Sequence, residues 1–98
     1  MTTIGTELIA AERQRQIDVE GWAPEHDDEH HGQELVRAAR AYLFEVLAPH
    51  QFGFHPQEWP WETPWWKPSP DPVRNLIKAG ALVAAEIDRL QREASASS

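Results

Sequence analysis

An all-α fold is the class that the sequence predicts, from three observations. Apolar residues recur at helical spacing in three separate stretches, and no stretch alternates as an amphipathic β-strand would. Seven of the eight prolines are confined to residues 48–72, which excludes a continuous helix or a central strand there. With 98 residues the chain has the length of one small domain. We therefore expect a single domain over residues 1–98, made of three helices and one long loop.

The first predicted helix covers about residues 3–19. Ile4, Leu8 and Ala11 recur at helical spacing, and the run AERQRQ consists mainly of good helix formers. The first half of this helix has one apolar face, whereas the second half is mostly charged. Gly21 is expected to end the helix, because glycine readily takes the left-handed conformation that follows a helix C-terminus.

The second predicted helix covers about residues 30–47. One apolar stripe runs along it and is made of Leu35, Ala39, Tyr42, Leu43 and Val46. Acidic residues near its start favour the positive end of the helix dipole. Pro49 closes the helix, since proline cannot continue the hydrogen-bond pattern.

A loop over residues 48–71 connects the second and third helices. It contains most of the large aromatic side chains of the chain, namely Phe52, Phe54, Trp59, Trp61, Trp65 and Trp66. These side chains are too apolar for a solvated linker. We expect an ordered proline- and tryptophan-rich loop that wraps the helices and completes the core.

The third predicted helix covers about residues 72–93. Asp71 suits its N-cap and Pro72 its first position. Residues that follow the helical repeat over five turns are Val73, Leu76, Ile77, Gly80, Val83, Ala84, Ile87 and Leu90. Because Ala79 and Leu82 lie off this stripe, we expect the helix to contact a second surface, either the tryptophan loop or another subunit. The remaining residues, 94–98, are interpreted as a frayed tail.

Composition and charge exclude several classes of function. The chain has no cysteine, so neither a disulfide nor a thiolate metal site is available. Nine basic against sixteen acidic residues argue against a DNA- or RNA-binding protein. The N-terminal residues lack a cationic stretch followed by an apolar run, and no stretch of the sequence is apolar over the length of a membrane span. We expect a soluble protein of the bacterial cytoplasm, and a homo-oligomer, since a chain this small buries limited surface.

The excess negative charge is concentrated in residues 20–34, which contain six acidic and no basic residues. Within this segment the sequence EHDDEHH places His26, Asp27, Asp28 and His30 close together. If the segment is helical, residues four apart share a face and could hold a divalent cation such as Zn²⁺, Mg²⁺ or Mn²⁺. The alternatives are a solvated acidic turn that caps the second helix, or hydrogen bonding to a ligand or protein partner.

Aromatic and cationic residues near the third helix suggest a ligand site. A tryptophan can stack on a nucleobase, and a helix N-terminus with nearby cations favours a phosphate. The candidate ligand-binding residues are Trp22, Trp59, Trp61, Trp65, Trp66, Lys67, Arg74, Lys78 and, on the first helix, Arg13. The structural alternative is that the tryptophans only complete a small core.

The chain resembles a family of small phage and prophage proteins. The resemblance lies in AERQRQIDVEGWAPEHDDEHHGQEL, in the WPW and WWKP pieces of the loop, and in DPVRNLIKAGALVAAEIDRL, which cover most of residues 10–90. The family has no established activity of its own. By analogy with other small phage proteins that are helical oligomers, and from the aromatic and cationic residues above, we expect a helical oligomer that binds a small nucleotide without turnover. Such a protein could sequester a nucleotide signal of bacterial immunity and so serve in counter-defence.

Two alternative functions remain open at this stage. One is a metal-dependent nucleotide pyrophosphohydrolase that resembles the all-α MazG type, with acidic residues from Glu25 to Glu34 on one helix and Glu86 and Asp88 on another. The spacing departs from that family, because Glu86 and Asp88 are two residues apart and point to different helix faces. The other alternative is an acidic module that binds and inhibits a host protein. The sequence favours a binding protein over an enzyme.

Overall fold

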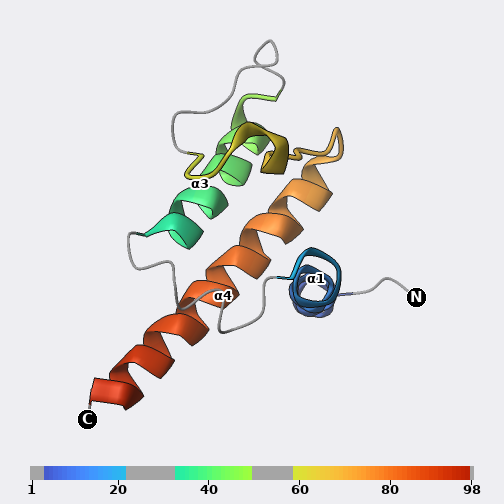
Figure 1. Cartoon of the computed structure of the whole chain (residues 1–98). Coiled ribbons are helices and arrows are strands. Elements are labelled where there is room, and N and C mark those ends of the chain that lie inside the picture. Colours follow the sequence, from blue (N-terminus) through green and yellow to red (C-terminus); the bar gives the residue numbers. More distant parts are fainter. Residues whose placement is uncertain (1–3, 22–32, 50–58, 98) are drawn as a thin grey trace.

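The computed structural model describes residues 4–21, 33–49 and 59–97. These ranges contain three α-helices, a single 3-10 turn and no strand (Figure 1). The elements are α1 (Gly5–Glu20), α3 (Glu34–Leu47), the turn η1 (Thr63–Trp65) and α4 (Pro72–Ser97). The prediction of an all-α fold is therefore confirmed. No helix within the described ranges is long and apolar enough to span a membrane.

The helix ends follow local sequence signals. Gly21 has a φ of 73° and its backbone N–H donates to the Gln16 carbonyl, as expected of a glycine that ends a helix. At the start of α4, the Asp71 carboxylate accepts a hydrogen bond from the Val73 backbone N–H at 2.9 Å. Asp71 therefore caps α4 with Pro72 at the first helical position, as predicted.

The C-terminal end of α4 differs from the expectation. The helix continues to Ser97, so it includes residues 94–97, which the sequence suggested were frayed. These residues contain no glycine or proline, and alanine is the strongest helix former, so nothing interrupts the helix. One turn earlier, Arg89 donates to Glu93 at 2.8 Å, an i,i+4 pair that supports this part of the helix.

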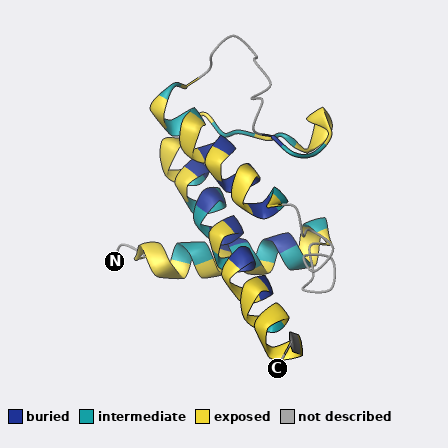
Figure 2. Ribbon diagram, turned by 90° about the vertical axis from the view of Figure 1, so that its left-hand side faces the viewer, coloured by how far each residue is buried: buried dark blue, intermediate teal, exposed yellow. Residues whose placement is uncertain are grey.

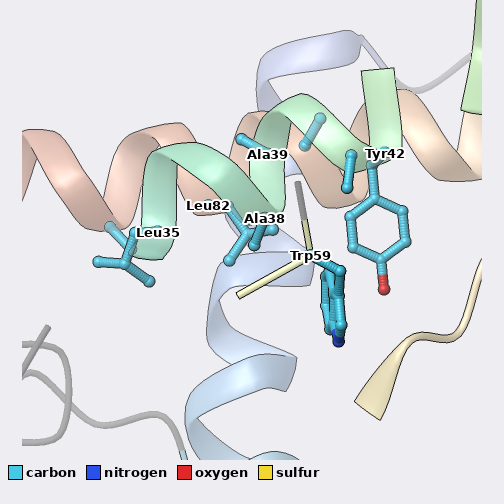
Figure 3. Close-up of a cluster of buried hydrophobic side chains, with 9 residues drawn as sticks. Leu35, Ala38, Ala39, Tyr42, Trp59 and Leu82 are labelled. Carbon is cyan, nitrogen blue, oxygen red and sulfur yellow. The ribbon is translucent and has the colours of Figure 1, made fainter. Parts of the chain in front are cut away.

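The core lies mainly between α3 and α4, which run antiparallel beside each other (Figure 1). Its members are Leu35, Ala38, Ala39, Ala41, Tyr42, Trp59, Ala79, Leu82 and Ala85 (Figure 3). More than half of these are alanines, and small side chains allow two helices to approach closely. Trp61 and Trp66 are partly buried and pack against this core.

The face of α4 that is buried against the core is not the apolar stripe that the sequence showed. Asn75, Ala79, Leu82, Glu86 and Arg89 are buried, whereas most of the apolar stripe is exposed. The polar members of the buried face have partners, which apolar periodicity does not reveal. The Arg89 Nε lies 2.6 Å from the Glu86 carboxylate, and the Asn75 side chain both donates to and accepts from the Ser69 backbone at 2.8 Å.

Helix α1 crosses α4 near the middle of α4 (Figures 1 and 2). It packs differently from what its apolar residues suggest, since its buried residues are Glu12 and Gln16 while Ile4 is 59% exposed. Ile9 lies directly on Gly80 of α4, where an added Cβ would come within 2.7 Å of the Ile9 Cδ1 atom. Gly80 therefore provides the space for this crossing, and a polar cluster around Glu12 provides much of the contact.

Candidate functional site

A small solvent-open pocket lies where all three helices and the segment before α4 meet. It is lined by Glu12, Arg15, Gln16, Glu20, Tyr42, Trp65, Lys67 and Lys78. The enclosed volume is about 10 Å³, which is close to the minimum that holds one water molecule. The site is therefore a charged surface depression with a water-sized interior, rather than a deep cavity.

Glu12 of α1 anchors one wall of this pocket. Its side chain is 1% exposed and pairs with two arginines, Arg15 one turn along α1 and Arg74 of α4. The Arg15 guanidinium donates two hydrogen bonds, at 2.8 and 2.9 Å, to the two Glu12 carboxylate oxygens. Of the two ion pairs, the one with Arg74 joins α1 to α4. The Glu12 carboxylate therefore both lines the pocket and holds these two helices together.

The pKa of Glu12 reflects this arrangement. Burial by itself raises the pKa, but the Arg15 hydrogen bonds and the charges of Arg74 and Arg15 outweigh it, and the pKa lies below its ordinary value of 4.5. Glu12 is therefore ionised at neutral pH.

Lys78 of α4 also lines the pocket. Its ammonium donates to the Lys67 backbone carbonyl at 2.7 Å and lies 5.5 Å from the centre of the Tyr42 ring. Burial and, after it, the nearby charge of Arg74 lower the pKa of Lys78 below 10.5. An anion beside the Lys78 ammonium would favour its charged form.

Tyr42 and Trp65 provide the aromatic part of the site. Burial is the main cause that raises the pKa of Tyr42 to about 12, so its ring stays neutral at physiological pH. Tyr42 also packs on Trp59 and Trp66, with ring centres 5.8 and 4.8 Å away, which fixes it to the core. Trp65 is 45% exposed, with the Lys67 ammonium 5.6 Å from its ring centre. Trp65 thus offers an accessible aromatic surface next to the cations.

Among the described residues, the charges around the pocket are mainly positive. Four cationic side chains meet two carboxylates there, namely Arg15, Lys67, Arg74 and Lys78 with Glu12 and Glu20. Among the described residues, the local surplus is two positive charges. A surplus of positive charge attracts anions to this place.

Gln16 adds an unsatisfied polar atom to the pocket wall. The residue is 2% exposed, and its side-chain nitrogen donates to Glu12 at 3.3 Å. Its side-chain oxygen is buried and has no hydrogen-bond donor within the described part of the chain. A buried acceptor of this kind is normally satisfied by a water or a ligand group, and the water-sized interior lies beside it.

The structure brings together only some of the residues that the sequence suggested for ligand binding. Trp65, Lys67 and Lys78 line the pocket, and Arg74 contacts Glu12 at its edge. Trp59 is buried in the core, and Trp61 and Trp66 pack against it, in agreement with the alternative that these rings are structural. Arg13 of α1 is not part of the pocket lining. Trp22 lies outside the described residues.

The suggested metal ligands His26, Asp27, Asp28 and His30 also lie outside the described residues. Within residues 4–21, 33–49 and 59–97, no three histidine or acidic side chains are grouped so that they could hold a metal ion. Glu86 and Asp88, which were considered for a second acidic helix, do not form one acidic site. Glu86 pairs with Arg89 in the core, whereas Asp88 is exposed.

Five residues of the pocket lining were not selected from the sequence: Glu12, Arg15, Gln16, Glu20 and Tyr42. The sequence analysis selected Arg13 on the first helix, but Arg13 and Arg15 are both cationic and only the crossing of α1 over α4 distinguishes them. Tyr42 was expected in the core, and it serves both as a core residue and as a pocket wall.

The chain was also compared with protein-family models, curated proteins and solved structures, and no match was found.

Proposed function

We propose that this chain is a phage or prophage accessory protein that binds a small nucleotide-type ligand without converting it. The observation that carries the proposal is the surplus of two positive charges that the described residues place beside an accessible indole. As a homo-oligomer in the host cytoplasm, the protein captures a nucleotide signal of bacterial immunity, a counter-defence role proposed by analogy with other small phage proteins.

The proposed binding mode follows from the shape of the pocket. Its interior has room for about one water molecule, so the ligand lies across the rim and does not enter the fold. The ammonium groups of Lys67 and Lys78 face the phosphate, with Arg15 behind them. The base stacks on the exposed face of Trp65, which is a sequence-tolerant interaction for any nucleobase. The Gln16 acceptor binds a water that the ligand can share.

Isothermal titration calorimetry with ADP, ADP-ribose and a cyclic dinucleotide tests this binding mode. We expect saturable binding of at least one of them, weakened about tenfold or more by Lys78→Gln, because a hydrogen bond to a charged group contributes roughly 1.5–3 kcal/mol. Trp65→Ala should also weaken nucleotide binding. Arg37→Gln, which removes an exposed cation from α3, should leave nucleotide binding unchanged.

Nucleotide binding should also weaken as the pH rises through the lowered pKa of Lys78, since the neutral amine no longer pairs with phosphate.

The outcome distinguishes the proposal from its two alternatives. Ligand recovered unchanged after the protein is denatured supports capture without turnover. Release of pyrophosphate from nucleoside triphosphates with Mg²⁺ or Mn²⁺ would contradict it in favour of a pyrophosphohydrolase. Absence of binding to all three nucleotides, together with a host protein that co-purifies and is released by moderate salt, would contradict it in favour of a protein-interaction module.

A further inference from the structure

An apolar stripe on α4 stays about half exposed in the described part of the chain, apart from Gly80, which Ile9 of α1 covers. Its members are Val73, Leu76, Val83, Ile87 and Leu90, which are between 44% and 54% exposed. They lie on one side of the helix, because their positions differ by three, four or seven residues. Single exposed apolar residues are ordinary on protein surfaces, but a continuous stripe along about 25 Å of helix is typical of an interface.

The stripe follows the pattern of a helix that packs against another helix. Positions 73, 76, 80, 83, 87, 90 and 94 alternate in steps of three and four, which is the heptad spacing of a packing seam. None of these seven positions is charged. At Gly80 the Ile9 side chain of α1 covers the position and supplies the missing apolar group. The charged residues of α4 all lie at other positions, namely Arg74, Lys78, Glu86, Asp88, Arg89, Arg92 and Glu93.

Helix α3 extends this surface. Val36 and Leu43 are 47% and 42% exposed and each directly follows a buried residue, Leu35 and Tyr42. On α4, Val83 directly follows the buried Leu82 in the same way. One residue is a rotation of about 100° about the helix axis. The two helices run antiparallel and are both right-handed. The rotation therefore places Val36 and Leu43 of α3 on the same side of the α3 and α4 pair as Val83.

We infer that this surface binds a second copy of the chain, with α4 antiparallel to the partner's α4. This inference deepens the homo-oligomer of the proposed function, but it does not depend on ligand binding. Two chains of charge −7 repel each other, so a shared interface between them must be free of charge, as this stripe is. Antiparallel pairing also places α3 against the partner's α3, which buries Val36 and Leu43 as well. The result is a bundle of two α3 and two α4 helices.

The size of the surface suits a pair of this kind. From Val73 to Ala94 the seam is about 30 Å long, and two helices side by side are about 20 Å wide. That footprint approaches the roughly 800 Å² that each partner buries in a standard interface. When the segment Leu76 to Leu90 overlaps fully with the same segment of the second copy, Val83 lies next to Val83 of the partner subunit, at the two-fold axis.

Cysteine variants test the arrangement directly, because the chain has no native cysteine. With an antiparallel seam centred on residue 83, Val83→Cys should form a disulfide-linked dimer under mild oxidation. Leu90→Cys should not, because the two copies of that position are about 20 Å apart, far beyond disulfide reach. Equal cross-linking of both variants would contradict the antiparallel arrangement.

Sedimentation of the ligand-free chain tests the dimer itself. We expect twice the monomer mass of 11.2 kDa at tens of micromolar, and a shift to monomer in Ile87→Asp with unchanged far-ultraviolet circular dichroism. Val19→Asp, which places the same charge at a 71% exposed apolar position on α1, should remain a dimer. A wild-type chain that sediments as a monomer, or a Val19→Asp variant that dissociates like Ile87→Asp, would overturn the inference. Neither result bears on nucleotide binding.

Discussion

Glu12→Gln is expected to lower the free energy of unfolding by about 3 kcal/mol. The substitution keeps the size of the side chain but leaves Arg15 and Arg74 facing a neutral amide in a place where the carboxylate was 1% exposed. Removal of one partner from a buried ion pair costs roughly 3–5 kcal/mol, and the lower end applies because both arginines are about one third exposed and can turn to water. Urea unfolding at a fixed protein concentration measures the loss.

Glu7→Gln is the matched control for this variant. Glu7 lies on the same helix but is exposed, so the change should stay within about 0.5 kcal/mol. Equal losses in the two variants would show that Glu12 does not join α1 to α4.

The difference in stability between wild type and Glu12→Gln should itself depend on pH. The pKa of Glu12 is below 4.5 in the folded chain and near 4.5 in the unfolded chain. At a pH between these two pKa values, the unfolded state binds more protons than the folded state. The stability that Glu12 contributes is therefore complete above pH 4.5 and is lost as the pH falls through the lower, folded pKa. Unfolding curves of the two chains should converge over that interval. A difference that stays constant into strong acid would contradict the pairing of Glu12 with its arginines.

Leu82→Ala is the second variant with a large expected effect, again about 3 kcal/mol. Leu82 is fully buried between α3 and α4, and most of its neighbours in the core are alanines, which cannot reach into the space left behind. Substitutions of this kind cost roughly 2–5 kcal/mol, according to how far the surroundings collapse. Thermal or urea unfolding measures the loss.

Val19→Ala serves as the comparison for the core variant. Val19 is 71% exposed on α1, so its truncation should change the stability by less than about 0.5 kcal/mol. If Leu82→Ala were as mild as Val19→Ala, the core would not lie between α3 and α4 as Figure 3 shows it.

Elements with strong local signals could be predicted from the sequence. Asp71 and Pro72 define the start of α4, and Gly21 defines the end of α1, because each acts on the backbone next to it. The orientation of α4 could not be predicted in the same way. Its most apolar stripe is exposed, and the face against α3 contains Glu86 and Arg89, whose burial depends on their pairing with each other.

The candidate site shows the same division. Trp65, Lys67 and Lys78 are close in sequence, and their proximity in space could be anticipated. Glu12 and Arg74 are 62 residues apart, and their contact exists only because α1 crosses α4 at Gly80. Apolar periodicity says little about α1, since the buried residues of this helix, Glu12 and Gln16, are polar and Ile9 packs on Gly80 of α4. Long-range polar contacts of this kind have no signature in one sequence.

The Trp65 indole provides the most direct test of the central claim, that this pocket binds a nucleotide. In a ¹⁵N-labelled sample its side-chain N–H resonance can be assigned by its absence from Trp65→Phe, and the sample is then titrated with ADP, ADP-ribose and a cyclic dinucleotide. We predict that at least one of them shifts the Trp65 resonance progressively to saturation. The Trp59 resonance should stay in place, because that indole is buried and donates to the Glu62 carbonyl at 3.1 Å. A Trp65 resonance that none of the three nucleotides moves would contradict the account.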